Sequence, residues 1–324
     1  LAKSIFESNH TNTIKSINDL AYAYWFEGRY RDAEPLFLRA VEIRKRLLGA
    51  DHPDTLTSIN GLAGLYIDQG RYGDAKPLFL LALEGRRRVL GPDHPDTLTS
   101  INDLACVHWY EGQYDEAKSL LLRALETRKR VLGSDHPDTL TSINDLAGVY
   151  RYEGSYDASE SLYLQAWNSR ERVLGSDHPD TLTSINDLAG LYVDQSRYGE
   201  AMPLYLRAQE DRKRVLGPDH PDTLASINDI ADLYSSLGQY GKAEPLYLYA
   251  VEARSRILGP DNGDTLASIG NLATVYFTQR RYDDAETFFL YTLQANERVF
   301  GPDNPVSLIS VNNLAVLYEA QGRS

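Results

Sequence analysis

Apolar residues in this chain recur at intervals of three and four, the spacing that places them on one face of an α-helix. In the segment 53–69, Ile59, Leu62, Ala63 and Tyr66 fall on such a face. The pattern predicts a helix over residues 53–69, with one apolar stripe turned towards a core.

A second apolar stripe follows after a short turn. Its members keep the i, i+3, i+4, i+7, i+8 spacing of a helix and are Ala75, Leu78, Phe79, Ala82 and Leu83. Pro77 is compatible with this helix because it lies near the helix start, where its missing N–H has no helical partner. The pattern predicts a second helix over residues 73–90.

Residues that favour helix ends flank both helices. Pro53 suits the first helical position, His52 before it can cap the helix, and Asp54 in the first turn complements the helix dipole. Gly70 ends the first helix, since glycine readily adopts the left-handed conformation found at helix C-termini. Gly91 ends the second helix in the same way, so the unit is a helix–turn–helix.

The unit repeats along the whole chain. The string HPDT begins at His52, His94, His136, His178 and His220, always 42 residues apart. A fixed period of this length is typical of stacked helical repeats, in which neighbouring units complete each other's core. We therefore predict an all-α, superhelical solenoid of helix–turn–helix repeats without strands.

Weaker forms of HPDT keep the register at both ends of the chain, at residues 10–13, 262–265 and 304–307. Residues 1–324 are therefore expected to form a single repeat array. It would comprise seven full units from about residue 10 and the first helix of an eighth, with residues 1–9 as the remnant of a preceding helix. On this interpretation the sequence is a piece of a longer protein.

These residues resemble the tetratricopeptide repeat in the arrangement LA…Y…GRY…DA…LF..AL. The 42-residue length and the strings NDLAGLY and RYGDAKPLFLLALEGRRRVLGPDHPDTL are similar to the kinesin-light-chain type. The resemblance covers nearly the whole chain and implies that the first helices line a concave groove. It also implies a role in protein–protein interaction, and repeats of this type form the sensor arrays of many NTPase receptors of the NB-ARC kind.

The formal net charge of −13 argues against binding to nucleic acid, which requires a clustered basic face, and against an anionic membrane surface. No apolar run reaches about eighteen residues, so we expect no membrane-spanning segment. The opening LAKSIFESNH lacks the features of a signal peptide. Cys106 is the only cysteine, which excludes an intramolecular disulfide and fits a cytoplasmic location.

The repeated histidines do not predict a metal site. Equivalent residues of stacked helices lie on the order of 10 Å apart, whereas zinc ligands lie about 2 Å from the ion. His108 stands where other units have Tyr66 or Tyr150, so we expect it to pack in the core. No residue is singled out as a nucleophile with a base beside it. The sequence predicts no enzyme, no metal and no cofactor.

The second helices end in basic runs at residues 86–88, 128–130 and 212–214. A glutamate lies four residues before the last arginine of each run, in the pairs Glu84–Arg88, Glu126–Arg130 and Glu210–Arg214. Such pairs stabilise a solvated helix face. We therefore interpret the runs as surface ion pairs rather than as phosphate-binding sites.

An asparagine recurs on the first helix, opposite its core stripe. It is Asn18, Asn60, Asn102, Asn144, Asn186, Asn228 and Asn312, while the seventh unit has Gly270 followed by Asn271. An amide both donates and accepts hydrogen bonds, so this ladder can pair with the backbone of an extended peptide. Alternatively, the asparagines bond to neighbouring helices and hold the stacking. Both interpretations remain open at this point.

Residues on the groove side differ between units. The first unit has Tyr22, Trp25 and Phe26, the third has Cys106, Trp109 and Tyr110, and the fourth has Arg151 and Tyr152, whereas the second has Gly64 with Asp68 and the fifth Gly190 with Asp194. Exposed aromatic rings are costly in water and mark interfaces. We predict that they bind a peptide together with the asparagines. The alternative is that some of them, Trp25 above all, seal a repeat boundary.

The sequence therefore predicts a scaffold whose concave groove holds a peptide or protein segment. The acidic charge balance favours a basic partner. Two other functions stay possible: a ligand-sensing array within a larger receptor or regulated enzyme, and a module that self-associates into a homo-oligomer through exposed terminal helices.

Overall fold

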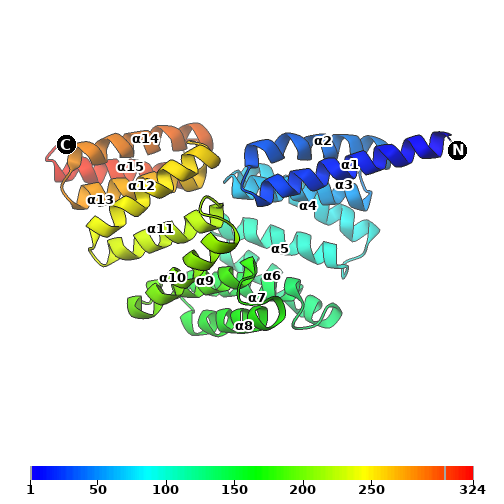
Figure 1. Ribbon diagram of the computed structural model, residues 1–324, viewed down its shortest axis with the longest axis horizontal. Coiled ribbons are helices and arrows are strands. Elements are labelled where there is room, and N and C mark those ends of the chain that lie inside the picture. The colour runs from blue at the N-terminus through cyan, green and yellow to red at the C-terminus, as the bar shows by residue number, and fades with distance from the viewer. Residues whose placement is uncertain (1, 303, 324) are drawn as a thin grey trace. The chain divides into compact units, whose positions relative to one another are not determined.

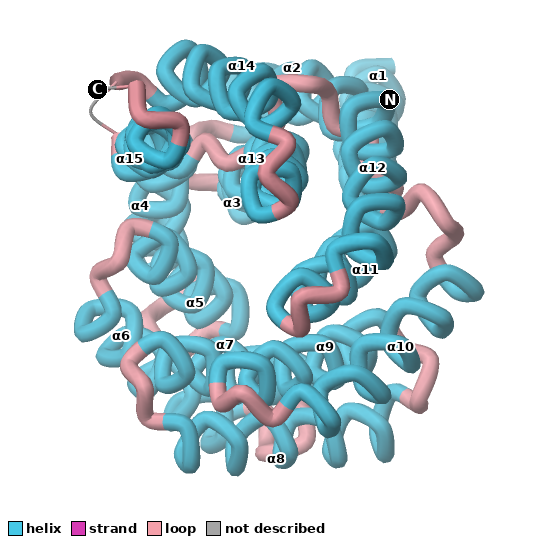
Figure 2. Tube along the Cα trace, turned by 90° about the vertical axis from the view of Figure 1, so that its left-hand side faces the viewer, coloured by secondary structure: helices cyan, strands magenta, loops and turns pink. Residues whose placement is uncertain are grey.

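The structure, a computed structural model, describes residues 2–302 and 304–323, with side chains from residue 13 onward. The described residues form helices and no strand (Figures 1 and 2). The helices are α1 (Ala2–Phe26), α2 (Tyr30–Leu48), α3 (Pro53–Asp68), α4 (Tyr72–Val89), α5 (Pro95–Tyr110), α6 (Tyr114–Val131), α7 (Pro137–Tyr152), α8 (Tyr156–Leu174), α9 (Pro179–Asp194), α10 (Tyr198–Val215), α11 (Pro221–Ser236), α12 (Tyr240–Ile257), α13 (Gly263–Thr278), α14 (Tyr282–Phe300) and α15 (Pro305–Ala320). This confirms the all-α repeat fold.

The ends of α3 and α4 lie within one residue of the predicted ends. The His52 side chain caps α3, since its Nδ1 accepts a hydrogen bond from the Asp54 backbone N–H at 3.2 Å. Gly70 has a φ of +75°, as the end of a helix followed by a tight turn requires. The capping role predicted for the repeated histidines is therefore confirmed here.

The first unit begins differently. Helix α1 runs without interruption from Ala2 to Phe26, through residues 10–13, where other units have a loop and a capped helix start. The prediction that residues 1–9 are the remnant of a preceding helix stays a prediction. The side chains of residues 1–12, His10 included, lie outside the described residues.

The core is built from the predicted apolar stripes. Ala63 and Ala82 have no exposed surface, and Phe79 is 2% exposed, so paired helices approach closely around small residues. Leu83 of α4 clusters with Leu98 of α5, because each second helix also packs on the first helix of the next repeat. The expected core position of His108 is wrong: its ring is only partly buried, and its Nδ1 contacts Gln113.

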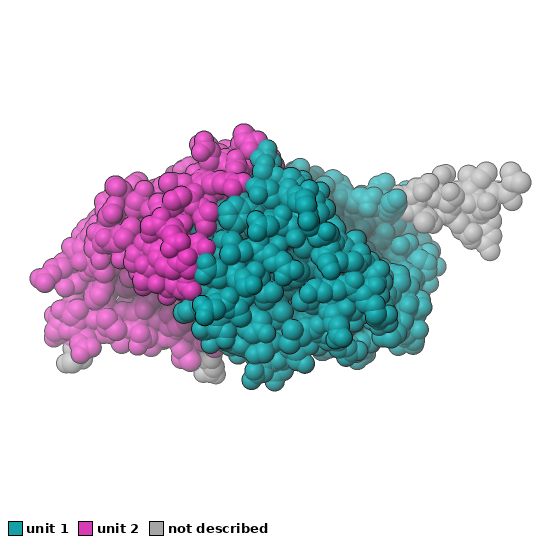
Figure 3. Space-filling view, turned by 90° about the horizontal axis from the view of Figure 1, so that it is seen from below, with its two compact units in different colours: residues 1–191 teal, residues 192–324 magenta. Residues whose placement is uncertain are grey.

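The chain divides into two compact units, Leu1–Leu191 and Tyr192–Ser324, coloured separately in Figure 3. The first contains α1 to α8 and most of α9, and the second contains the end of α9 and α10 to α15. The boundaries of the single array stay a prediction. Among the described helices, none combines the length and the apolar character needed to cross a membrane.

Candidate functional site

The repeated asparagines lie at the junctions between repeats. Asn102 is 4% exposed, and its Oδ1 accepts hydrogen bonds from the Ser142 hydroxyl at 2.8 Å and from Arg128 Nη1 at 3.3 Å. Its Nδ2 donates to a carboxylate oxygen of Asp145 on α7. One amide therefore joins the third repeat to the fourth through Ser142 and Asp145, and also binds Arg128 of its own repeat.

Neighbouring junctions in the first compact unit use the same bonds. Ser100 donates to Asn60 at 2.9 Å, and Ser184 donates to Asn144 at 2.8 Å. The Nδ2 of Asn60 donates to Asp103 at 2.7 Å, and that of Asn144 donates to Asp187 at 2.7 Å. These bonds support the interpretation that the asparagines hold the stacking.

The peptide-binding role of the asparagines stays a prediction. Because the Oδ1 atoms of Asn60 and Asn102 already accept two hydrogen bonds each, substituting them will weaken the junction as well as any binding. Asn228 keeps a related arrangement in the second compact unit, where its Oδ1 accepts from Ser268. Asn186 holds the same sequence position on α9, and Asn312 is exposed on α15.

The first arginine of each basic run is buried rather than solvated. Arg128 is 2% exposed, and besides Asn102 its guanidinium donates to the Asp138 carbonyl, the Ser142 hydroxyl and the Thr99 hydroxyl. Equivalent arginines are also buried, namely Arg44, Arg86, Arg170, Arg212 and Arg254. The interpretation of the runs as wholly surface features is wrong.

The predicted pairing of the last arginines is also corrected. Arg88 pairs with Asp51 and Arg130 with Asp93, in the loop 37 residues earlier, instead of with the glutamate one turn before. Arg214 pairs with Asp211 on its own helix. The loop aspartates are the partners because the C-terminal end of each second helix lies beside the loop that precedes the first helix of the same repeat.

A row of aspartates, missed by the sequence analysis, lies beside the asparagines. Asp103 and Asp145 directly follow Asn102 and Asn144 in the string INDLA, and both are half-buried. Burial raises the pKa of each carboxyl from 3.8 to about 6, although hydrogen bonds from Asn60 and Asn102 and the nearby arginines oppose that rise. The recurrence of aspartate after the groove-side asparagine was the available signal.

The aromatic residues of the first repeat lie against the second repeat. The Trp25 ring packs over Gly64, and its Nε1 donates to Asp68 at 2.6 Å. The Tyr22 hydroxyl donates to the Thr57 carbonyl at 3.3 Å, and burial raises the pKa of Tyr22 to about 12. Trp25 and Tyr22 thus seal a repeat boundary, as the alternative interpretation had it, whereas Phe26 is 63% exposed.

Five rings form a continuous aromatic ladder from the second to the fourth repeat: Tyr72, Tyr110, Trp109, Tyr152 and Tyr114. Tyr110 stacks on Tyr72 at 4.7 Å between centroids, and Tyr152 stacks on Tyr114 at 5.9 Å. Trp109 lies between them, 5.0 Å from Tyr110 and 5.3 Å from Tyr152. Tyr110 is 47% exposed and Tyr152 56% exposed, so the ladder has an open surface.

Large groove-side residues of one repeat face glycines of the next. Trp109 lies against Gly148, just as Trp25 lies against Gly64, and the Arg151 guanidinium lies against Gly190. Arg151 also lies over the Tyr152 ring, 5.8 Å from its centroid. The 39-residue spacing between a large residue and a glycine was a signal that could have placed these side chains from the sequence.

The tetratricopeptide repeat model matches residues 11–84, 58–130, 107–166, 138–210, 186–256, 236–290 and 264–324, which together span nearly the whole chain. The chain belongs to the tetratricopeptide repeat family.

Several solved structures have similar tetratricopeptide folds. A Podosopora anserina protein with nearly identical repeats of the kinesin-light-chain type is 28% identical, with 63% of this chain and 97% of that chain covered and a TM-score of 0.49. BtubC (BKLC) of P. vanneervenii is 20% identical over 71% of this chain and 92% of that chain, with a TM-score of 0.51.

NprR in complex with its cognate peptide NprX is 13% identical over 96% of this chain and 85% of that chain, with a TM-score of 0.62. The tetratricopeptide repeats predicted from the sequence are thus confirmed. No curated protein matches this chain.

The candidate site consists of polar and aromatic side chains of the first helices and of the turns that follow them. Across the described part of the chain, no group of three or more His, Cys, Asp or Glu side chains is arranged to hold a metal ion. Cys106 is half-buried on α5, where burial raises the pKa of its thiol well above the usual value. Its neighbours on the same helix face are Asp103 and Tyr110, one turn away on either side.

Proposed function

We propose that this protein is a non-enzymatic interaction scaffold that binds an extended, basic segment of another protein across α5 and α7. The observation that carries the proposal is the aromatic ladder, whose two half-exposed tyrosines lie on the same helix faces as the aspartate row. Asp103 and Tyr110 are seven residues apart on α5, as are Asp145 and Tyr152 on α7, so each pair shares a face.

The charges around the ladder favour a cationic partner. The nearby lysines are already paired, Lys76 with Glu111 at 2.5 Å and Lys118 with Glu153 at 2.7 Å. Among the described residues, Asp103 and Asp145 have no lysine partner; they accept hydrogen bonds from amides and lie near buried arginines. Arg151 already lies over the Tyr152 ring, so a lysine or arginine of the partner would gain a carboxylate and the exposed Tyr110 ring, and cations bind to aromatic faces.

A peptide-binding groove is compatible with this fold. NprR, which has a similar fold at 13% identity, forms a complex with a peptide. A sensor array within a larger receptor would use the same groove face, so the same binding test applies to that alternative. We also propose that the protein is cytoplasmic, as expected from the sequence.

The proposal is tested with synthetic peptides of equal length and graded net charge, titrated against the protein by fluorescence anisotropy. Basic peptides should bind and acidic ones should not. Tyr110→Ala and Tyr152→Ala should each weaken binding roughly three- to thirtyfold, as central aromatic contacts commonly do.

The matched controls are Leu80→Ala and Leu122→Ala on the second helices, which are 40% and 44% exposed. They remove a similar exposed side chain from the opposite face of the repeat and should leave affinity unchanged. Equal losses in the leucine and tyrosine variants, or binding that ignores peptide charge, would contradict the proposal.

Self-association is a second candidate function, favoured by the open face of α15. Leu308 is 54% exposed and Val311 is 45% exposed, whereas Leu266 and Ile269, their equivalents on α13, are 3% and 5% exposed. We propose that a second copy covers this face. Light scattering should then give a concentration-dependent dimer mass that Leu308→Gln abolishes, and a monomer mass at all concentrations would contradict it.

A further inference from the structure

The first repeat departs from the following three at two positions that face its junction. Lys15 stands where α3, α5 and α7 have Thr57, Thr99 and Thr141. Gly61 of α3 stands where α5, α7 and α9 have Asp103, Asp145 and Asp187. The first junction therefore gains one cation and lacks one anion.

Both changes remove a hydrogen-bond partner from a buried side chain. In later repeats the asparagine Nδ2 donates to the aspartate, but position 61 is a glycine, and no described residue accepts a hydrogen bond from the Nδ2 of Asn18. The Nη2 of Arg86 and of Arg128 donates to a threonine hydroxyl. Within the described chain Arg44 has no such bond, because Lys15 occupies that position.

Arg44 and Asn18 are nonetheless deeply buried, with exposures of 6% and 4%. Arg44 keeps its two Nη1 bonds, to the Asp54 carbonyl at 2.7 Å and to the Ser58 hydroxyl at 2.6 Å. The Nδ2 of Asn18 and the Nη2 of Arg44 are therefore donors on deeply buried residues that remain available to a ligand that accepts hydrogen bonds.

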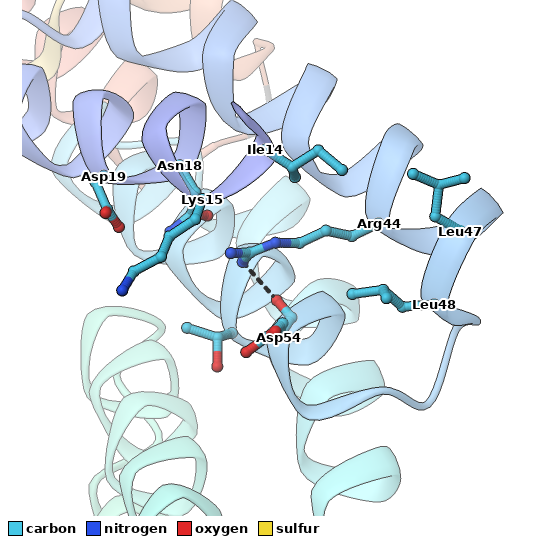
Figure 4. A pocket seen from close by; sticks show the side chains of 9 residues that line it. Ile14, Lys15, Asn18, Asp19, Arg44, Leu47, Leu48 and Asp54 are labelled. Carbon is cyan, nitrogen blue, oxygen red and sulfur yellow. Dashed lines mark hydrogen bonds between the residues drawn. The ribbon is translucent and has the colours of Figure 1, made fainter. Parts of the chain in front are cut away.

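These donors border a cavity of about 380 Å³ between α1, the end of α2 and the start of α3. In Figure 4 the Arg44 guanidinium extends from α2 towards Asn18 and Lys15 on α1, with Asp54 of α3 on the other side. Thr57 adds a hydroxyl to the wall. The remaining wall is apolar and consists of Ile14, Leu47 and Leu48.

The charges that line the cavity favour an anion beside the buried Arg44. Asp19 and Asp54 also line it, but both are exposed, and water and salt screen exposed charges. Arg44 is buried and, in the described part of the chain, forms no ion pair, so its charge is screened far less. Lys15 adds a second cation on the same side, although it is exposed and its charge is screened like those of Asp19 and Asp54.

We propose that this cavity is a binding site for a phosphate monoester. Four side chains can donate hydrogen bonds into it: Arg44, Lys15, Asn18 and Thr57. A phosphate monoester carries three terminal oxygens and close to two negative charges near neutral pH, which matches two cations and four donors. The apolar wall accommodates the organic group to which the phosphate is attached. The site differs in position and charge from the groove face of α5 and α7 and does not depend on the proposed function.

The experiment is isothermal titration of the whole chain with phenyl phosphate and with inorganic phosphate, at constant ionic strength in chloride. Saturable binding to one site per chain is expected, with benzoate at least about tenfold weaker because it has two oxygens and one charge. Lys15→Thr, which restores the residue of the later repeats, should weaken phenyl phosphate binding by about tenfold.

Two further variants distinguish the site from general charge effects. Lys129→Thr removes the same charge from an exposed position on α6 and should leave the affinity unchanged. Asn18→Asp keeps the acceptor for Ser58 and places a carboxylate beside Arg44, so it should abolish binding without lowering the thermal midpoint. A phosphoserine peptide that binds more tightly than phenyl phosphate assigns the phosphate to a protein partner, and equal affinities assign it to a small molecule.

Three results would overturn the proposal: no saturable heat with either phosphate, equal losses in the Lys15 and Lys129 variants, or benzoate binding as tight as phenyl phosphate. Circular dichroism of each variant ensures that a loss of binding is not a loss of fold.

Discussion

At the scale of single residues, the junctions between repeats depend on polar side chains that are almost completely removed from water. Ser142 and Thr139 have no exposed surface, and Arg128 retains 2%. Ser142 and the Nη atoms of Arg128 bond to other members of the network, and Thr139 bonds to the Gly133 carbonyl, whereas the Nε of Arg128 is buried without a partner among the described residues. Partners of this kind let buried polar groups specify a unique packing. The half-buried aspartates at the edge of this network have a raised pKa.

The first prediction concerns Asp103. Its folded pKa of about 6 lies above the unfolded value near 4, so the folded state binds more protons between these values. Its contribution to stability is therefore greatest at low pH and is lost as the pH rises through about 6. Asp103→Asn keeps an acceptor for Asn60 but cannot ionise, so it should stabilise the protein at neutral pH relative to the wild type.

The measurement is urea unfolding of both proteins near neutral pH and near pH 4. The difference in unfolding free energy between Asp103→Asn and the wild type should be smaller near pH 4 than near neutral pH. Asp93→Asn provides the control, because Asp93 is an exposed loop residue paired with Arg130. A stability difference between Asp103→Asn and the wild type that is the same at both pH values would show that burial does not perturb this carboxyl.

The buried arginines and the aspartate row are the features of single residues that were not predicted from the sequence. Arg86 follows Phe79, Ala82 and Leu83 at the i, i+3, i+4, i+7 spacing, so helical phase placed it on the core stripe. Its charge and its basic neighbours suggested a solvated face instead. Burial of this charge depends on partners from two other helices, α3 and α5, and these partners can be identified only when the register of the stack is known.

At the scale of helices and turns, the sequence predicted most of the structure. The boundaries of α3 and α4 followed from residues whose effects are local, namely a capping histidine, a proline and a glycine. The beginning of α1 did not follow, because α1 continues through HTNT from Ala2 instead of beginning there as the other first helices begin at HPDT, NGDT or NPVS. To predict contacts between helices of different repeats, one would have to compare the sizes of two side chains 39 residues apart, such as Trp25 and Gly64.

The second prediction concerns the contact of α1 with α3. A Cβ atom on Gly64 would lie 2.4 Å from the Trp25 ring, so Gly64→Ala should destabilise the protein by about 1–3 kcal/mol through overpacking. In a Trp25→Ala background the same change should cost little or stabilise, since alanine favours helix over glycine by roughly 1 kcal/mol.

A double-mutant cycle of urea unfolding free energies measures this coupling. Gly73→Ala is the control, because an added Cβ there meets no atom within 4 Å. Additive effects of the Gly64 and Trp25 substitutions would show that the ring does not occupy the space beside Gly64.

At the scale of the whole molecule, contacts are confined to neighbouring helices within each compact unit, together with next-but-one first helices such as α5 and α7. Stability in such arrays is close to a sum of local terms. The division of the chain at Leu191 and Tyr192 was not predicted, because the sequence period continues through α9 without a break. The groove-face residues were predicted as a set. Which of them seal a boundary could not be predicted from one repeat, because it depends on the residues that they face in the neighbouring repeat.

The third prediction follows from this local character. Phe79→Ala removes a side chain that is 2% exposed in α4 and should cost about 3–5 kcal/mol. Hydrogen exchange should rise in α3, α4 and their neighbours, while α12 to α14 of the second compact unit keep their protection. Leu80→Ala, which truncates the exposed neighbour, should leave the exchange pattern unchanged. A uniform rise along the chain would contradict nearest-neighbour stabilisation.

The regular spacing of the junction bonds bears on how a gene of this kind can change its length. Serine and asparagine partners lie 40 residues apart, and the amide and carboxylate partners lie 43 apart. Recombination that deletes residues 95–136 would bring Ser142 to Asn60 and Asp145 to its amide, the same chemistry as before. A copy can thus be lost or duplicated with its junctions intact, whereas a deletion that is not a whole number of 42-residue repeats leaves buried donors unmatched.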